Sequence, residues 1–137
     1  MNLKILSDLH IEHGEPKHLD AVKHGDEDAL ICAGDVSNNG PDGLYWLRER
    51  FPDTRIVFVP GNHEYYCGKA INELNEEMIR HGKGLGIDVL INDSVKINGF
   101  EFIGSTLWSN FGDSPFSHES RIASERYVND FRLIRVN

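Results

Sequence analysis

Asp, His and Asn side chains occur in three short motifs along the chain, each directly after a run of aliphatic residues. The motifs are Asp8-Leu9-His10, Gly34-Asp35 and Gly61-Asn62-His63-Glu64. In an open α/β sheet, ligands bind in the crevice outside the carboxyl ends of the strands, so polar groups at these ends can share one site. Three such motifs in succession predict a metal site. Its expected ligands are Asp8, His10, Asp35 and Asn62.

The residue types and their spacing indicate which cation would bind. Side chains two residues apart on an extended segment point to the same side, so Asp8 and His10 could bind one cation together. An oxygen ligand beside an imidazole suits manganese, iron or zinc better than calcium, which prefers oxygen alone. Asp35 follows Gly34, where the backbone can approach closely, and its carboxylate could bridge two cations. Asn62 would add an amide oxygen to the second cation.

The same motifs predict phosphoryl chemistry. Two metal ions about 3.5 to 4 Å apart can clamp a phosphoryl group and activate a water for in-line attack. His63 could contact the phosphate or protonate the leaving oxygen, because imidazole titrates near neutral pH and often acts as general acid or base. We therefore assign His63 and Asn62 to the catalytic group. Glu64 is expected to orient His63 rather than to bind metal.

Each motif taken alone also has a purely structural explanation. Asp8 and His10 could be a capping residue and a surface histidine, and Gly34-Asp35 could be a turn. Asn62-His63 could hydrogen-bond its own loop backbone. Their occurrence in order, each after a buried strand, favours the metal site. The other histidines are interpreted as solvated or incidental, with His13 the nearest to a motif: His13, His18, His24, His81 and His118.

The segments between the motifs predict the elements that position them. Short apolar runs without helical spacing are typical of strands buried on both faces of a parallel sheet, and they occupy residues 3–7, 29–33, 56–59 and 89–91. Helices are expected over 42–51, capped by Asp42 and ended by Pro52, and over 69–80, ended by glycines. The alternation predicts an α/β fold.

A change of pattern follows the second helix. Asn98-Gly99 separates two apolar runs, 94–97 and 100–103, and this dipeptide is the strongest short signal for a hairpin with a type I′ turn. We expect the antiparallel hairpin to join the sheet. Residues 108–120 are rich in Ser, Asn, Gly, Asp and Pro and predict an exposed loop, followed by a short helix near 122–128.

Length, composition and charge limit the class of protein. The 137 residues are typical of one domain, expected over 1–137. Hydrophobic residues make up 39% and charged residues 26%, as in soluble globular proteins. The net charge of -8 argues against a nucleic-acid groove. With Cys32 and Cys67 the only cysteines, and no apolar stretch long enough for a signal peptide or membrane span, we expect a cytoplasmic protein without a membrane partner.

The motifs together resemble those of calcineurin-like metallophosphoesterases, in which Asp-x-His, Gly-Asp and Gly-Asn-His-Glu follow successive strands. Residues 104–108 and 129–135 are similar to stretches of one bacterial and phage branch of that family, so the resemblance covers nearly the whole chain. It implies a layered α/β sandwich with a mostly parallel sheet. It also implies a metal-dependent hydrolase of phosphomonoesters or phosphodiesters, which acts on a small phosphorylated substrate through a water activated by two metal ions.

The chain departs from the family pattern in its C-terminal part. Two later His motifs of the family, the second being Gly-His-x-His, are absent. The first metal would keep Asp8, His10 and Asp35, whereas the second would keep only Asp35 and Asn62. We therefore expect an amino-terminal portion of a metallophosphoesterase, with a sandwich incomplete at the C-terminal side, about one bound ion and little turnover. The alternative is a non-catalytic, truncated remnant that retains a single metal site.

Two other phosphatase classes fit the motifs less well. A haloacid-dehalogenase-type phosphatase requires a second aspartate two residues after the first, where His10 stands. Protein Ser/Thr phosphatases of the wider family continue the second motif with Asp-Arg-Gly, whereas this chain has Val36-Ser37-Asn38-Asn39. A phosphoprotein substrate is therefore disfavoured. The sequence does not choose between monoester and diester, and it leaves the metal and the oligomeric state open.

Overall fold

A four-stranded parallel sheet forms the centre of the molecule. The computed structural model describes residues 1–16, 25–112 and 115–136. The strands are β1 (Leu3–Leu6), β2 (Ala29–Cys32), β3 (Ile56–Phe58) and β4 (Ile87–Val89). They are hydrogen-bonded in the order β1-β2-β3-β4, and every neighbouring pair is parallel. The predicted α/β fold with a parallel sheet is confirmed, and all four carboxyl ends lie at the same edge.

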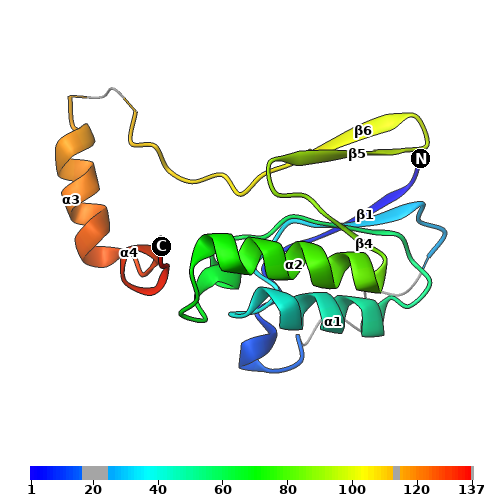
Figure 1. The fold of residues 1–137 in the computed structure, drawn as a ribbon. Helices are drawn as coiled ribbons and strands as arrows, with labels where there is room; N and C mark the ends of the chain where they lie inside the picture. The colour runs from blue at the N-terminus through cyan, green and yellow to red at the C-terminus, as the bar shows by residue number, and fades with distance from the viewer. Residues whose placement is uncertain (17–24, 113–114, 137) are drawn as a thin grey trace.

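Two helices, α1 (Gly40–Arg50) and α2 (Ile71–Leu85), lie side by side on one face of this sheet (Figure 1). Apolar residues of the two helices pack against alternate residues of the strands, which face the same way because side chains alternate along a strand. This main core is fully buried; it includes Leu30, Cys32, Ile56 and Phe58 from the sheet and Leu44, Leu47, Leu74 and Met78 from the helices. It fixes the strand ends that carry the motifs.

Both helices differ from their predicted bounds. Helix α1 begins at Gly40, two residues before the predicted start, with Asn39 in the capping position and a proline in its first turn, where proline is well tolerated. Helix α2 runs five residues beyond the predicted end and stops at Gly86, whose φ of 66° is left-handed. Gly82 lies within the helix and is buried where an added Cβ would clash with Val89 of β4, so this glycine serves close packing rather than helix termination.

The predicted hairpin forms, but it does not join the sheet. Strands β5 (Asp93–Ile97) and β6 (Phe100–Gly104) pair antiparallel around Asn98 and Gly99, both of which have positive φ. They make a separate two-stranded sheet, which lies over the face opposite the helices (Figure 1). Its apolar residues pack in a second cluster with the central sheet, formed by Ala29, Val57, Leu90 and Ile97 together with Val95 and Phe102.

The C-terminal segment returns to the start of α2. Helix α3 (Ser117–Tyr127) begins five residues before its predicted start, and α4 (Asp130–Leu133) follows it. The N–H of Ile71 donates to the carbonyl of Arg135 at 2.9 Å, which holds this segment beside α2. No helix within the described ranges is long and apolar enough to cross a membrane.

Candidate metal centre

Backbone hydrogen bonds join the loops that carry the three motifs. The N–H of Asp8 donates to the carbonyl of Gly34 at 3.1 Å. The N–H of His10 likewise donates to the carbonyl of Asp35 at 3.0 Å. On the other side, the N–H of His63 donates to Oδ1 of Asp35 at 3.1 Å. The second motif therefore lies between the first and the third at the carboxyl edge of the sheet.

Three of the predicted site residues have left-handed backbone conformations. The φ angle is 55° at Asp8, 45° at His10 and 55° at Asp35, in a region that costs a non-glycine residue about 1 to 2 kcal/mol. Strain of this kind concentrates at functional sites. The expectation that Asp8 and His10 lie on an extended segment, with both side chains on one side, is wrong. The chain turns at each of these residues instead.

His10, Asp35 and His63 offer ligand atoms that all lie within 4.8 Å of one another. The three residues are half-buried, and the rings of His10 and His63 meet edge to face with centroids 4.5 Å apart. Two imidazoles and a carboxylate form a mixed nitrogen and oxygen set, which suits manganese, iron or zinc. The residues therefore fit a divalent cation, and His63 is close enough to be a ligand itself.

Hydrogen bonds at Nδ1 orient both imidazole rings. Nδ1 of His10 lies 3.1 Å from Oε1 of Glu12. Nδ1 of His63 lies 3.0 Å from Oδ1 of Asn38 and 3.7 Å from the same oxygen of Glu12. A histidine that binds metal usually donates its other ring N–H to an oxygen in this way, which fixes the ring and its tautomer. Nε2 is then the nitrogen of each ring that can bind a cation.

Glu12 was not expected at the site. It belongs to the short 3₁₀ helix η1 (Ile11–His13), which starts directly after His10 and brings the carboxylate beside both rings. Burial tends to raise the pKa of Glu12, but hydrogen bonds from its own backbone and from His10, with the nearby charges of His10 and His13, lower that pKa overall. The Glu12 carboxylate therefore places a negative charge next to the two imidazoles. Its position two residues after the first motif was the available signal.

Glu64 joins the second and third motifs from inside the core. Its side chain is fully buried, at 0% exposure. Its carboxylate oxygens accept hydrogen bonds from four backbone N–H groups, those of Asp35 at 2.9 Å, Val36 at 2.8 Å, Ser37 at 3.3 Å and Gly61 at 2.7 Å. Burial raises the pKa of Glu64, and the four hydrogen bonds oppose that shift. The carboxylate thus holds the loop of Asp35 against the loop of Gly61.

The expectation that Glu64 orients His63 is wrong. The ring of His63 is held by Asn38 and Glu12. The reason is the 3₁₀ helix η3 (His63–Tyr65), which follows Asn62 directly and buries Glu64 and Tyr65. Successive side chains of a tight turn point in different directions, so His63 faces the site while Glu64 enters the core. The sequence alone did not specify this turn.

The side-chain amide of Asn62 is held by two residues. Nδ2 donates to Oδ1 of Asp130 at 2.8 Å and to the hydroxyl of Tyr66 at 3.0 Å. The Tyr66 hydroxyl itself donates to the same oxygen of Asp130. Burial first, then the neighbouring Asp130, raises the pKa of Tyr66 to about 12, so its hydroxyl keeps its proton at neutral pH. Asp130 lies on α4 and was not anticipated as part of the site.

Asp8 and the other histidines that the sequence analysis considered do not belong to this group of ligand atoms, as far as the described residues show. Asp8 is exposed at the end of β1 and is not a member of the group formed by His10, Asp35 and His63. The side chain of His13 is 78% exposed. His81 contacts Tyr45, and His118 is exposed on α3. His18 and His24 lie outside the described residues.

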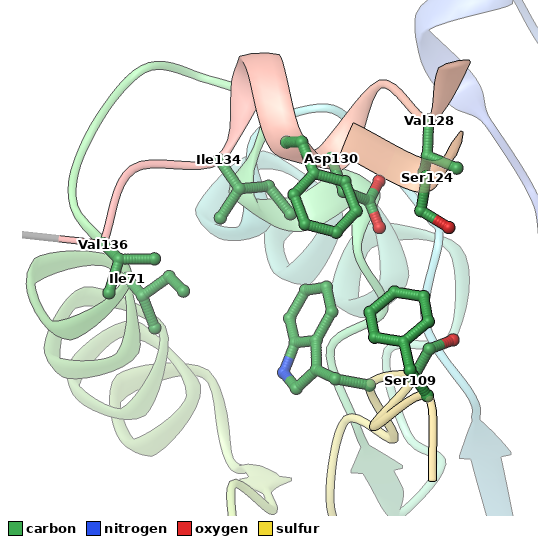
Figure 2. Close-up of a pocket in the computed structure, with 10 residues that line it drawn as sticks. Ile71, Ser109, Ser124, Val128, Asp130, Ile134 and Val136 are labelled. Carbon is green, nitrogen blue, oxygen red and sulfur yellow. The ribbon is translucent and has the colours of Figure 1, made fainter. Parts of the chain in front are cut away.

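A mainly apolar pocket lies beside Asp130. Its volume is about 480 Å³. Figure 2 shows residues of α2, α3 and α4 around it, with Asp130 and Ile134 on one wall and Ser109 opposite. Aromatic side chains contribute to its lining; they are Trp108, Phe111 and Phe131. Because Asp130 also contacts Asn62, the pocket adjoins the residues of the third motif.

Comparison with protein families identifies the type of chain. The family model of calcineurin-like phosphoesterases matches residues 1–135. An uncharacterized protein of Acanthamoeba polyphaga mimivirus is 28% identical over 149 aligned positions, which cover 97% of this chain and 51% of the relative.

A solved structure shares the fold. The crystal structure of a phosphopantetheinyl hydrolase from Mycobacterium tuberculosis superposes with a TM-score of 0.67 at 20% identity, over 98% of this chain and 55% of that chain. The likeness supports the layered α/β fold that the resemblance implied. The chain spans about half the length of both proteins, 51% of the viral relative and 55% of the hydrolase.

Proposed function

Because the chain belongs to the calcineurin-like phosphoesterase family, we propose that its metal centre serves the hydrolysis of phosphomonoesters or phosphodiesters of small molecules. The observation that carries this proposal is the convergence of His10, Asp35 and His63 within 4.8 Å at the carboxyl edge of the sheet. Divalent cations bound there would polarise the phosphoryl group and lower the pKa of a coordinated water.

The chain's own residues would hold and orient the reactants. We propose Asp8, His10 and Asp35 for a first cation and Asp35 with Asn62 for a second. Glu12 keeps Nε2 of His10 free for binding, since it occupies Nδ1 of that ring. His63, with Nδ1 held by Asn38, would contact the phosphate and donate a proton from Nε2 to the leaving oxygen.

The test compares metal binding and turnover in matched variants. Manganese binding is measured by calorimetry, and hydrolysis with p-nitrophenyl phosphate and its bis ester, for the chain, Asp35→Asn and Asp53→Asn. Asp53 is an exposed loop residue away from the motifs and serves as the control. We expect Asp35→Asn to weaken manganese binding by about tenfold or more, with Asp53→Asn unchanged. Equal binding by all three proteins would contradict the metal centre.

His63→Ala separates the two roles open to this residue. If His63 serves the phosphate, the variant keeps manganese affinity within about twofold and loses turnover, because general acid catalysis contributes about a hundredfold or more. A loss of manganese affinity comparable to that of Asp35→Asn would make His63 a ligand instead.

A non-catalytic site for one ion is the second candidate. The group of three residues within 4.8 Å suffices for a single cation, whereas the motifs leave only Asp35 and Asn62 for a second. One bound ion per chain with no hydrolysis of either ester would favour this candidate. Manganese-dependent hydrolysis that disappears in Asp35→Asn would favour the enzyme.

A further inference from the structure

We propose that Asp130 is a positioning residue of the metal centre, which fixes the side-chain amide of Asn62 so that its oxygen is the atom left for a cation. The inference rests on the proposed function, because it takes Asn62 to be a metal ligand. Asp130 is separated from Asn62 by 68 positions in the sequence, and no motif of the first three strands includes it.

The contacts form a closed triangle of half-buried groups. Nδ2 of Asn62 donates to Oδ1 of Asp130 at 2.8 Å and to the Tyr66 hydroxyl at 3.0 Å. The Tyr66 hydroxyl donates to the same Asp130 oxygen. All three residues are half-buried, so competition from water is reduced and each hydrogen bond is more effective than on an open surface.

The two orientations of the Asn62 side-chain amide differ in energy because of the groups that surround it. An ionised carboxylate only accepts hydrogen bonds, so Asp130 can pair with the NH₂ end of Asn62 but not with its oxygen. A flipped amide would set its oxygen against the carboxylate and turn two N–H donors toward the cation. Neither contact is favourable. Asp130 thus selects the orientation in which Oδ1 points away from Asp130 and can act as a ligand.

The fold explains how a residue so far along the chain reaches the site. Asp130 is the first residue of α4. The segment that follows is anchored by Ile134, which packs against the main core, and by the hydrogen bond from Ile71 to Arg135. Tyr66 also lies against the ring of His63, with centroids 4.4 Å apart. The triangle therefore supports both residues of the third motif that the proposal uses.

The test follows the Asn62 side-chain amide by nuclear magnetic resonance while Zn²⁺ alone is added. In the unaltered chain we expect the ¹⁵N resonance of this amide to shift on Zn²⁺ addition, because coordination through Oδ1 polarises the amide. In Asp130→Asn the shift should be lost or split between two amide orientations, since asparagine also offers donors. Asp130→Glu, which keeps an acceptor-only group, should recover part of the shift, whereas Asp53→Asn should behave like the unaltered chain.

Backbone amide spectra report whether each variant folds. If Asp130→Asn does not fold, Tyr66→Phe removes the two hydrogen bonds of the triangle that involve the hydroxyl, with little change of shape, and it should reduce the Zn²⁺-induced shift. The proposal is overturned if the Asn62 amide of the unaltered chain does not respond to Zn²⁺, or if the folded variants respond as it does. A failure of the metal centre itself is distinguishable, because Zn²⁺ would then leave the His10 and His63 ring resonances unchanged as well.

Discussion

The buried carboxylate of Glu64 holds together two of the loops that carry the candidate ligands. Glu64 accepts hydrogen bonds from four backbone N–H groups of two loops, although the residue before it, His63, faces the site. Unsatisfied buried donors are costly, and these loops contain residues whose backbone is already strained at Asp35. The role of Glu64 is therefore to hold Asp35 and Gly61 together rather than to touch substrate.

Replacing Glu64 by glutamine should destabilise the protein strongly. Glutamine offers one acceptor oxygen and an NH₂ group, so some of the four N–H donors would face another donor. We expect a loss of about 2 to 4 kcal/mol in the free energy of unfolding, the range for breaking buried hydrogen bonds to a charged group. Urea denaturation measures it, with Glu76→Gln, an exposed residue of α2, as the control. Equal stability of both variants would contradict this role.

The two cysteines should differ in reactivity because Cys32 is buried and Cys67 is exposed. Burial raises the pKa of Cys32 to about 12, whereas Cys67 is exposed, and thiolate is the reactive form. At pH 8 a thiol reagent should label one cysteine per folded chain and two in denaturant. Because only the unfolded chain can readily ionise Cys32, the contribution of this residue to the free energy of unfolding is fully present below about pH 8.5, the ordinary thiol pKa. That contribution declines as the pH rises toward 12.

Cys67→Ser supplies the control for this experiment. The folded variant should show no rapid labelling, which assigns the reactive thiol to Cys67. Rapid labelling of the folded variant would mean that Cys32 is accessible and that its strand is less closely packed than the structure indicates.

At the scale of elements, Arg48 connects the ends of both helices to the loop before β3. Its guanidinium donates to five backbone carbonyls, those of Phe51, Pro52, Thr54, Leu85 and Gly86, at 2.8 to 3.0 Å. The last carbonyls of a helix have no partner within that helix, and a cation there also complements the helix dipole. One side chain thus satisfies groups from three segments.

Arg48→Lys tests this connection while keeping the charge. Lysine carries three donors on one nitrogen and cannot reproduce the planar fork of arginine, so several carbonyls would lose their partner. We expect a loss of about 2 to 3 kcal/mol in unfolding free energy. Arg80→Lys, at an exposed position of α2, should leave stability unchanged. Identical urea midpoints for the two variants would contradict the connection.

Local signals were enough to predict most elements but not how they pack. The alternation of buried strands and helices, and the turn at Asn98-Gly99, depend on neighbouring residues, and the structure confirms them. The hairpin was wrongly expected to join the sheet, because turn chemistry does not specify the surface on which a hairpin packs. The second helix does end at a glycine, Gly86, but later than expected, because Gly82 lies within the helix where it allows close packing against Val89.

The candidate site shows the same division. His10 and Asp35 were predicted from their place after buried strands, and the structure brings them together with His63. Glu12 and Asp130 were missed. Glu12 reaches the rings through a 3₁₀ turn, and Asp130 through a contact across 68 positions. Glu12 stands two residues after the first motif, but local sequence specifies neither the turn that begins at His10 nor a hydrogen bond across 68 positions.

At the scale of the whole molecule, the two faces of the sheet are covered unequally. Helices α1 and α2 cover one face, and the hairpin lies over the other (Figure 1). On the hairpin side, Ile5 of β1 is 69% exposed and Ile103 of β6 is 80% exposed. Exposed apolar patches promote association between molecules. We therefore expect the chain in solution to self-associate through this side.

Substitutions at two adjacent residues of β6 distinguish the effect of buried apolar surface on stability from the effect of exposed apolar surface on self-association. Phe102 packs against the second apolar cluster, while Ile103 points to solvent. Phe102→Thr should cost about 2 kcal/mol of unfolding free energy, because it removes buried apolar surface. Ile103→Thr keeps a β-branched residue and should leave stability unchanged while reducing self-association in sedimentation velocity. If Ile103→Thr instead destabilised the chain as much as Phe102→Thr, the hairpin would be packed through its other face, and the self-association expected from Ile5 and Ile103 would lose its basis.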